Sequence, residues 1–430
     1  MQETLWAESC SERVEAPPLD RSARVDLAII GGGFTGCAAA LEAARTGACV
    51  ALLEAGEIGQ GASGRNVGLV NAGLWLPPDT ILAQMGAGPG RRLIDALACA
   101  PDRVFELISR HDIACEPVRA GTLHCAHAPG ALPALADRLR QGNRLGAPLR
   151  LLDAAETAAR TGTAAFHGAL LDPRAGTVQP LAYCRGLARA AAQAGARLHG
   201  TTPVTALARD DAADGWRLEA GGHSLRARRV LLATNAYHGG MAAPLRPEFV
   251  TVRYSQFATA PLPPELRRSV LAGGEGAWDT ALVMSSFRCD AQGRLVLGGM
   301  GDAAGPTGPV HRAWARGRLA ALFPQLAEQP FAHVWSGRIA MTGDHLPRIV
   351  AFGPGALACF GYSGRGIAPG TVFGTAAARA LLLDETDGLP VAPVLSHSEP
   401  LRRARAALFE AGASAMHALQ VRPCRRSRGG

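Results

Sequence analysis

The sequence predicts an α/β fold that combines a Rossmann-like nucleotide-binding domain with an interleaved, β-rich second domain. Three observations support this prediction. A strand–helix–strand unit with a glycine-rich turn lies near the N-terminus, a second glycine-rich turn precedes a helix far downstream, and two β-rich stretches lie between them. A chain of 430 residues that is 48% hydrophobic and 19% charged also fits a globular protein with more than one domain.

The N-terminal unit is the clearest local pattern. Val25–Ile30 is predicted to be a buried strand, because its apolar residues run on without alternation, as in parallel sheets. A helix of small residues is expected at Cys37–Arg45, ended by Gly47. A second apolar strand is expected at Cys49–Leu53. Together these segments predict a βαβ unit with a right-handed crossover.

The turn of this unit has the pattern G-x-G-x-x-G, formed by Gly31, Gly33 and Gly36. Such glycines permit a tight turn, a close approach of backbone to a pyrophosphate, and close helix–strand packing. Glu54 ends the second strand, where a carboxylate accepts hydrogen bonds from ribose hydroxyls and disfavours a 2′-phosphate. This combination predicts dinucleotide binding.

Two further segments are rich in glycine. The stretch GASGRNVGLVNAGLW follows Glu54, and its Ser63, Arg65 and Asn66 are predicted to donate to a pyrophosphate. The turn GYSGRGIAPG precedes a helix predicted at Val372–Leu383, whose N-terminus would stabilise negative charge on a reduced flavin. Two distant loops that need close backbone approach favour FAD over NAD.

The predicted domains are discontinuous. Residues 1–85, 151–240 and 331–390 form the nucleotide-binding domain, and residues 86–150 and 241–330 form the second, α+β substrate domain. A C-terminal helix is expected within residues 391–421, followed by a basic tail at 422–430. The apolar side chains expected on one face of that helix are Leu401, Ala404, Leu408, Ala411, Ala415 and Leu419. This face predicts a helix docked on the body or, alternatively, a contact with a membrane surface.

Composition limits the classes of function. Lysine is absent, so the formal net charge of +8 comes from arginine, and Schiff-base chemistry is excluded. None of the ten cysteines forms a C-x-x-C pair, and no metal site is predicted. The first 20 residues lack a signal-peptide pattern and are expected to form a surface arm of a cytoplasmic protein. Basic and aromatic residues do not alternate as in a nucleic-acid groove.

The glycine motifs, with LLATNAY and LLEAGEIGQGASGRN, resemble the D-amino-acid oxidase superfamily of FAD-dependent oxidoreductases. The segments GRNVGLVNAGLWLPP, GTLHCAH, WDTALVMSSFRCDAQGRLVLGG and LRRARAALFEAGASAMHAL are most similar to bacterial L-pipecolate oxidases. The resemblance extends from about Leu5 to His417. It implies a fold of the D-amino-acid oxidase type, with FAD held non-covalently.

By this resemblance, the cofactor-binding residues are expected to be Gly31, Gly33, Phe34, Thr35, Gly36, Glu54, Ala55, Ser63, Gly64, Arg65, Asn66, Val67, Gly68, Leu69, Val204, Ala233, Thr234, Asn235, Gly361, Tyr362, Gly364, Arg365, Gly366 and Ile367. Many members of the superfamily bind the substrate carboxylate with an arginine where this chain has Ile339, next to Arg338. Arg365 is therefore the first candidate for a carboxylate clamp and Arg288 the second. Tyr254 is the third catalytic candidate.

The resemblance implies oxidation of a C–N bond in a cyclic secondary amino acid, namely L-pipecolate in lysine degradation, to a piperideine carboxylate. Alternatives are an acyclic amine such as γ-glutamylputrescine, an N-methyl amino acid such as sarcosine, or a flavin-binding scaffold without turnover. The expected electron acceptor is oxygen or a respiratory carrier. In the latter case, a peripheral contact with the inner membrane is expected.

Overall fold

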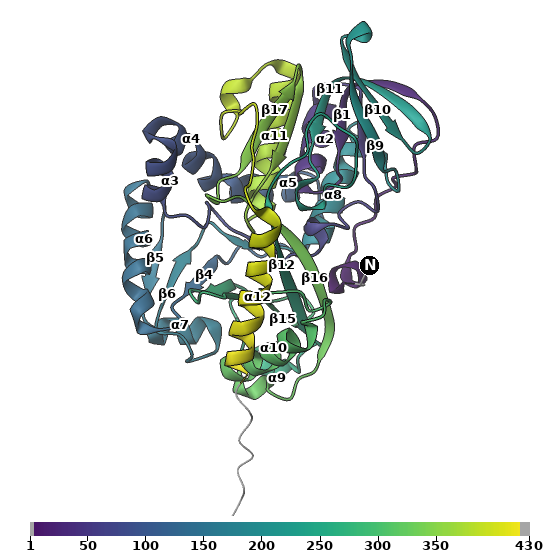
Figure 1. Ribbon diagram of the computed structural model, residues 1–430. Helices are drawn as coiled ribbons and strands as arrows, with labels where there is room; N and C mark the ends of the chain where they lie inside the picture. Colours follow the sequence, from purple (N-terminus) through teal and green to yellow (C-terminus); the bar gives the residue numbers. More distant parts are fainter. Residues whose placement is uncertain (1–3, 422–430) are drawn as a thin grey trace, which may run out of the picture.

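The structure, a computed structural model, describes residues 4–421 and contains two large mixed sheets (Figure 1). The first sheet has the strand order β17-β18-β11-β1-β2-β8, and β10 and β9 extend it from β11. Its strands are β1 (Ala23–Ile30), β2 (Val50–Leu53), β8 (Arg197–His199), β9 (Val204–Asp210), β10 (Gly215–Ala220), β11 (His223–Leu232), β17 (Arg348–Gly353) and β18 (Ala356–Phe360). The order and the parallel pairing of β1 with β2 and β11 confirm a Rossmann-like core.

The helix α2 (Phe34–Arg45) follows β1 directly, as predicted, and begins three residues before the expected Cys37. It packs against α8 (Pro180–Gln193) and α11 (Ile367–Leu383). Eleven of its residues are buried, which is feasible because most of them are alanine, glycine or other small residues. Close packing of α2 places the turn between β1 and α2 at the carboxyl edge of the sheet, where α/β folds bind ligands.

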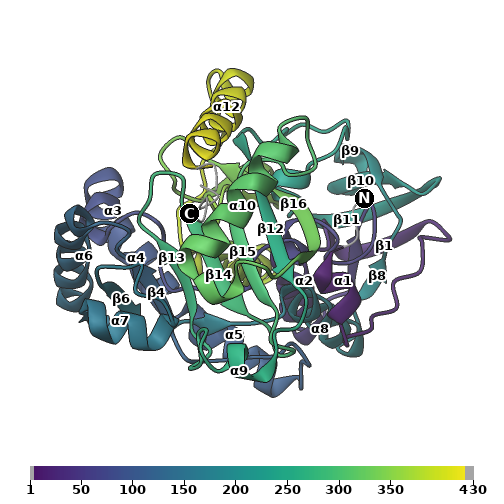
Figure 2. The same cartoon turned by 90° about the horizontal axis from the view of Figure 1, so that it is seen from below.

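The second sheet has the order β16-β12-β15-β14-β13-β4-β6-β5. Its strands are β4 (Thr122–Cys125), β5 (Arg150–Leu152), β6 (Ala169–Asp172), β12 (Val250–Thr259), β13 (Gly276–Asp279), β14 (Ser285–Cys289), β15 (Leu295–Met300) and β16 (Phe331–Met341). The helix α10 (Gly308–Leu322) covers one face, where Trp314 and Leu319 join Phe287 and Leu297 in one core (Figure 2). The opposite face of this second sheet is not covered by α10.

The remaining elements are short or peripheral. They are α1 (Leu5–Ser9), α3 (Pro78–Met85), α4 (Ala87–Ala98), α5 (Ala100–Arg110), α6 (Leu132–Arg144), α7 (Ala154–Thr161), α9 (Pro264–Arg267), α12 (Arg402–Gln420) and the two-stranded pair β3 (Leu69–Val70) and β7 (Gly176–Thr177). Within residues 4–421, no helix has the length and apolar character needed to cross a membrane.

The sheets differ from the predicted domain boundaries in three places. Residues 331–341, predicted for the nucleotide-binding domain, form β16 and pair with β12 of the second sheet over ten residue pairs. Residues 150–172 likewise contribute β5 and β6 to the second sheet. Helices α4 and α5 pack into the core of the first sheet, although residues 86–150 were assigned to the second domain. Sheet pairing between distant segments decides these boundaries.

The N-terminal segment is not a surface arm. Leu5 and Trp6 are fully buried. The Trp6 indole packs edge-on against Trp335, with ring centroids 5.9 Å apart, and its Nε1 donates to the Asn66 carbonyl oxygen at 2.7 Å. The polar residues around these two side chains suggested exposure, but burial of one tryptophan and one leucine outweighs them, because burial of a large apolar side chain stabilises by about 1.5–3 kcal/mol.

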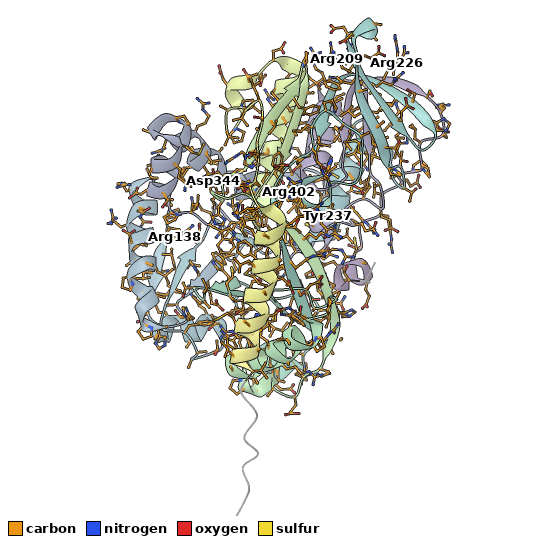
Figure 3. The ribbon with its side chains drawn as sticks, in the orientation of Figure 1. Arg138, Arg209, Arg226, Tyr237, Asp344 and Arg402 are labelled. Atoms are coloured by element: carbon orange, nitrogen blue, oxygen red, sulfur yellow. The ribbon has the colours of Figure 1, made fainter. Side chains whose placement is uncertain are left out.

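The C-terminal helix α12 is present, but its predicted docking face is wrong. Leu401, Leu408 and Leu419 are 72–78% exposed, whereas Ala413 and His417 are buried. Polar contacts hold the helix instead of an apolar stripe. Arg402, labelled in Figure 3, lies in the first turn and pairs with Glu248. The predicted basic tail at residues 422–430 lies outside the described residues.

A buried histidine pair joins α12 to α10. His311 Nδ1 lies 2.8 Å from His417 Nδ1, and His311 Nε2 lies 3.0 Å from Glu410 Oε1. The His417 ring also stacks on Trp314, with ring centroids 3.9 Å apart. His417 Nε2 has no hydrogen-bond partner. If His417 donates through Nδ1 and His311 donates to Glu410, a further proton on His417 would go to this unpartnered nitrogen.

We expect stability to depend on pH through His417. Burial, and secondarily His311, lowers the pKa of His417 from 6.5 to about 4, so the unfolded chain binds this proton more tightly than the folded protein. Between pH 6.5 and 4, stability should therefore fall by about 3 kcal/mol from this group alone. Urea unfolding at several pH values should show a shallower fall for His417→Phe. The exposed His167→Phe should follow the wild type, and parallel curves for all three proteins would contradict the assignment.

Candidate cofactor and substrate cavity

A cavity of about 1320 Å³ separates the carboxyl edge of the first sheet from the second sheet. Sites for one small ligand usually have volumes of about 300–1000 Å³, so this cavity has room for a large cofactor together with a substrate. Its lining comes from the turn after β1, residues 54–76, 203–205 and 233–241, β12, residues 278–286, β16, the turn before α11, and one face of α12.

The turn after β1 has the geometry of a pyrophosphate cradle. Gly31 has a φ of +112°, and a Cβ there would lie 2.8 Å from the Ala233 carbonyl oxygen. Gly33 is the N-cap of α2 and provides no capping side chain, so amide groups of the first helical turn other than that of Phe34 remain for a ligand. A pyrophosphate fits this arrangement because the helix N-terminus carries positive partial charge.

Glu54 is held at the end of β2 by its own loops. Its Oε2 accepts from the Gly32 amide at 2.7 Å and its Oε1 from the Gly56 amide at 3.0 Å. Each carboxylate oxygen has a further lone pair that can accept from a ribose hydroxyl. The side chain lines the cavity, as the G-x-G-x-x-G spacing predicts. The residues present therefore fit the adenosine end of FAD.

The polar side chains of Ser63 and Asn66 differ in their hydrogen bonds at this end of the cavity. Ser63 Oγ accepts from the Phe34 amide at 3.0 Å, which leaves its hydroxyl hydrogen for a phosphate. Asn66 Nδ2 donates to the carbonyls of Ala62 and Ser63, and its Oδ1 accepts from the Gly68 amide. Asn66 therefore shapes its own turn, since both ends of its amide are used locally.

Arg65 joins this segment to the second sheet. Its Nη1 donates to the Ser336 carbonyl at 3.0 Å and its Nε to the Gln60 carbonyl at 3.1 Å, and burial lowers its pKa. The Trp335 indole in turn donates to the Arg65 carbonyl at 3.1 Å. These hydrogen bonds connect the cavity-lining segment around Arg65 to β16 of the second sheet.

The second glycine-rich turn lies beside residues 233–235. Asn235 Oδ1 accepts from the Gly361 amide at 3.1 Å, and Tyr362 Oη lies 2.9 Å from Thr35 Oγ1. The following helix α11 begins at Ile367, and its N-cap Gly366 provides no capping side chain. The free amides at this helix N-terminus fit the predicted role of stabilising negative charge on a flavin.

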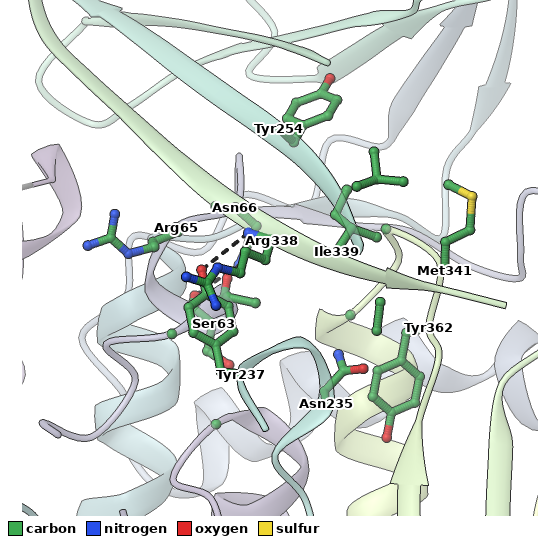
Figure 4. A pocket seen from close by; sticks show the side chains of 18 of the residues that line it. Ser63, Arg65, Asn66, Asn235, Tyr237, Tyr254, Arg338, Ile339, Met341 and Tyr362 are labelled. Carbon is green, nitrogen blue, oxygen red and sulfur yellow. Dashed lines mark hydrogen bonds between the residues drawn. The ribbon is translucent and has the colours of Figure 1, made fainter. Parts of the chain in front are cut away.

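The second sheet forms the opposite wall. Val252, Tyr254 and Gln256 alternate on β12 and all line the cavity. Figure 4 shows Tyr254 across the cavity from Asn235 and Tyr362. Tyr254 Oη lies 3.1 Å from Ser286 Oγ, and burial raises the pKa of this phenol, which keeps it neutral. This wall can offer hydroxyl groups to a substrate but not a phenolate base.

Ile339, which the resemblance places where many superfamily members have an arginine, lies on this wall. The neighbouring Arg338 extends to Tyr237, with its guanidinium 5.4 Å from the ring centre (Figure 4). The expected reversal of face on the strand explains this divergence. Neither residue puts a cation beside Tyr254.

Arg365 and Arg288, the candidate carboxylate clamps, are not part of the lining. The Arg365 guanidinium lies behind the indoles of Trp75 and Trp278, 4.7 and 5.0 Å from their ring centres, and donates to the Ala72 carbonyl. Burial, more than repulsion from Arg138, lowers its pKa to about 9. Arg288 is buried and donates to the Val178 carbonyl. Of the three catalytic candidates, Tyr254 alone lines the cavity.

Most of the predicted cofactor residues come together at the cavity. Those among the lining are Gly31, Gly33, Phe34, Thr35, Glu54, Ala55, Ser63, Arg65, Asn66, Val67, Leu69, Val204, Ala233, Thr234, Asn235, Tyr362, Gly364, Gly366 and Ile367. Those outside it are Gly36, Gly64, Gly68, Gly361 and Arg365, where the glycines lie beneath the lining and permit close backbone contacts.

The sequence interpretation missed part of the lining. Tyr237, Gln256 and Trp278 belong to it, as do five residues of α12. Alternation along β12 would have linked Gln256 to Tyr254, since residues two apart share a face. No local signal places α12 at the cavity. Within residues 4–421, no group of histidine, cysteine, aspartate and glutamate side chains could hold a metal ion.

Comparison with known proteins gives a consistent result. The family model described as "FAD dependent oxidoreductase", DAO, matches residues 26–380. The chain is 31% identical over 365 residues to "Probable oxidoreductase OrdL" of Rhizobium meliloti, with 84% of each chain covered. It is 29% identical over 366 residues to "Gamma-glutamylputrescine oxidoreductase" of Escherichia coli, again with 84% of each covered.

A solved structure shows the same fold. The crystal structure of glycine oxidase from Geobacillus kaustophilus matches with a TM-score of 0.65 and 24% identity, covering 83% of this chain and 94% of that chain.

Proposed function

Because the chain belongs to the DAO family of FAD-dependent oxidoreductases, we propose that this enzyme oxidises a C–N bond of an acyclic amine, such as γ-glutamylputrescine. The carbon loses a hydride and the nitrogen a proton, a C=N bond forms, and bound FAD supplies the two-electron acceptor. The residues of this chain bind and orient the amine, and exclude water from the reacting carbon.

The observation that carries this proposal is the neutral wall around Tyr254. An amino acid that places its carboxylate in an apolar site needs a cationic partner. Ile339 replaces that cation, Arg338 extends to Tyr237, and Arg365 is shielded by two indoles. An amine without a carboxylate next to the reacting carbon fits this wall better.

The cavity wall can orient such an amine through neutral hydrogen bonds. The paired hydroxyl groups of Tyr254 and Ser286 can donate or accept. The Gln256 side chain, 2% exposed, also lines this wall. These groups favour a substrate nitrogen that is uncharged when it reacts, since no carboxylate of the described lining near Tyr254 would stabilise an ammonium.

A substrate panel tests the proposal. Mixing the FAD-loaded enzyme anaerobically with γ-glutamylputrescine should bleach the flavin absorbance, and mixing with L-pipecolate or sarcosine should bleach it much more slowly. Rapid bleaching by L-pipecolate, with none by γ-glutamylputrescine, would overturn the choice of substrate and leave the reaction class unchanged.

L-Pipecolate is the second candidate, and one observation favours it. Arg365 Nε has no hydrogen-bond partner, and the two indoles that cover its guanidinium line the cavity. If the indoles move on binding, Arg365 could pair with a carboxylate. Loss of such a clamp costs roughly 2–5 kcal/mol.

The variant Arg365→Met distinguishes a role of Arg365 as support for the two indoles from a role as the carboxylate clamp. Since the guanidinium supports Trp75 and Trp278 from behind, we expect similar losses of kcat/KM for L-pipecolate and for piperidine, which has no carboxylate. A selective rise in KM for L-pipecolate, with unchanged FAD content, would instead identify Arg365 as the clamp.

The electron acceptor is proposed to be oxygen or a respiratory carrier. The exposed leucines of α12, Leu401, Leu408 and Leu419, would suit a peripheral membrane contact in the second case.

A further inference from the structure

The helix α12 borders the cavity with one face and docks with another. The residues that line the cavity are Leu408, Phe409, Gly412, Ala413 and Met416, a spacing that defines one side of a helix. Glu410 and His417 make the contacts to α10 described above. The helix is therefore held in place by groups other than those that face the cavity.

A second segment borders the same cavity near solvent. Leu282 and Met284, between β13 and β14, are part of the lining. Leu282 is 87% exposed and Leu408 of α12 is 72% exposed, although both line the cavity. A side chain can line the cavity and also be exposed to solvent only where the cavity opens to solvent. We call the group Leu282, Met284, Leu408, Phe409, Gly412 and Met416 the portal.

The portal carries no charge. Its side chains are aliphatic, aromatic or thioether groups, or absent at glycine. The charged residues of the lining are Glu54, Arg65 and Arg338, which lie among the segments that fit the cofactor or against Tyr237. A ligand passing through the portal would therefore exchange water for apolar contacts, which favours a hydrocarbon chain.

Gly412 is unusual within the portal. It lies in the interior of a 19-residue helix, where glycine costs about 0.5–1 kcal/mol relative to alanine. Its φ is not positive, and a Cβ there would meet no heavy atom within 4 Å. Neither backbone conformation nor packing requires this glycine. Because Gly412 has no side chain, space remains open on the cavity face of α12.

We propose that the portal binds an unbranched apolar chain of the substrate, and that Gly412 determines how long a chain can be accommodated. The inference rests on the proposed function in taking the substrate to be an amine. The amine end lies within the cavity, and its hydrocarbon chain extends along α12 between Leu282 and Leu408. Gly412 leaves room for methylene groups that a larger side chain would displace.

Binding of linear primary amines tests this proposal without turnover. Propylamine to octylamine would be titrated by anaerobic calorimetry into enzyme whose bound FAD has been reduced beforehand, so that the amine binds but is not oxidised. Wild-type affinity should rise with chain length by up to about fourfold per methylene, the equivalent of about 0.8 kcal/mol. In Gly412→Leu, octylamine should bind at least about tenfold more weakly, while propylamine should change by less than about twofold, because only the longer chain reaches the added side chain.

The matched control is Ala411→Leu, which places the same side chain one residue earlier, at an exposed position outside the lining. It should leave the whole series unchanged. Gly412→Ala should raise the melting temperature and weaken octylamine binding less than leucine does, which shows that the effect is not loss of folding.

Three outcomes would overturn the proposal: no dependence of wild-type affinity on chain length, equal losses for propylamine and octylamine in Gly412→Leu, or the same change in Ala411→Leu. If the chain-length pattern appears but no amine bleaches the flavin, the portal stands and the proposed function fails.

Discussion

Replacement of Glu54 by arginine should yield a nearly colourless protein. The carboxylate accepts from the Gly32 and Gly56 amides and fits the ribose hydroxyls of FAD. Arginine removes these acceptors and places bulk and positive charge in the adenosine end of the cavity. Charged hydrogen bonds contribute about 1.5–3 kcal/mol each, so the loss of two should weaken FAD binding by at least about a hundredfold.

The measurement is the FAD content per chain after purification, followed by fluorescence titration of FAD into the stripped protein. Glu57→Arg is the matched control, because Glu57 lies in the same loop with its side chain 70% exposed and pairs with Arg185 at the surface. It should keep about one FAD per chain. Wild-type FAD content in Glu54→Arg would show that the ribose is held elsewhere.

The sequence was sufficient for the elements whose signal is local. Continuous apolar runs predicted β1 and β2, because a strand buried on both faces leaves no alternation in the sequence. The run of small residues between them predicted the helix. The spacing of the glycines and of Glu54 within this unit predicted that Gly31, Gly33 and Glu54 lie together. Each requirement arises within one βαβ unit, so no distant segment was needed to infer it.

Elements that depend on distant partners were harder to predict. The assignment of β16 to the second sheet rests on its pairing with β12, which is remote in sequence. The apolar pattern of α12 predicted the leucine face as the docked one, whereas His311 and Trp314 hold the face that carries His417. Periodicity identifies an amphipathic helix, but it does not show which face meets a partner held by polar contacts.

The substrate end of the cavity also depends on residues that are distant in sequence, and it was harder to predict for this reason. Arg365 was expected at a flavin edge because its loop is glycine-rich, and the loop does border the cavity. The direction of its side chain depends on Trp75 and Trp278, which come from two other parts of the chain. Tyr254, the third catalytic candidate, lines the cavity, but the neutrality of the wall around it depends on three strands.

Replacement of Gly36 by alanine should unfold the region between β1 and α2, or at least abolish FAD binding. A Cβ at this position would lie far inside the van der Waals contact distance to the Gly31 carbonyl oxygen and 3.3 Å from Ile29 Cγ2. Neither neighbour can yield easily, because one is backbone of the cofactor turn and the other, Ile29 of β1, is fully buried. Overpacking of this kind costs typically about 1–3 kcal/mol, and here it also displaces the amides of the pyrophosphate cradle.

The matched control is Gly317→Ala in α10, a helical glycine whose added Cβ would meet no heavy atom within 4 Å. The same substitution should there stabilise the protein by about 0.5–1 kcal/mol, because alanine loses less backbone entropy in a helix. Opposite signs in urea unfolding, with FAD lost only from Gly36→Ala, are the expected result. The comparison separates the two effects of a methyl group, since helix propensity favours alanine at both positions and only the close contacts with Gly31 and Ile29 distinguish them. A Gly36→Ala protein with wild-type stability and a full complement of FAD would mean that α2 can move away from β1 without disturbing the cradle.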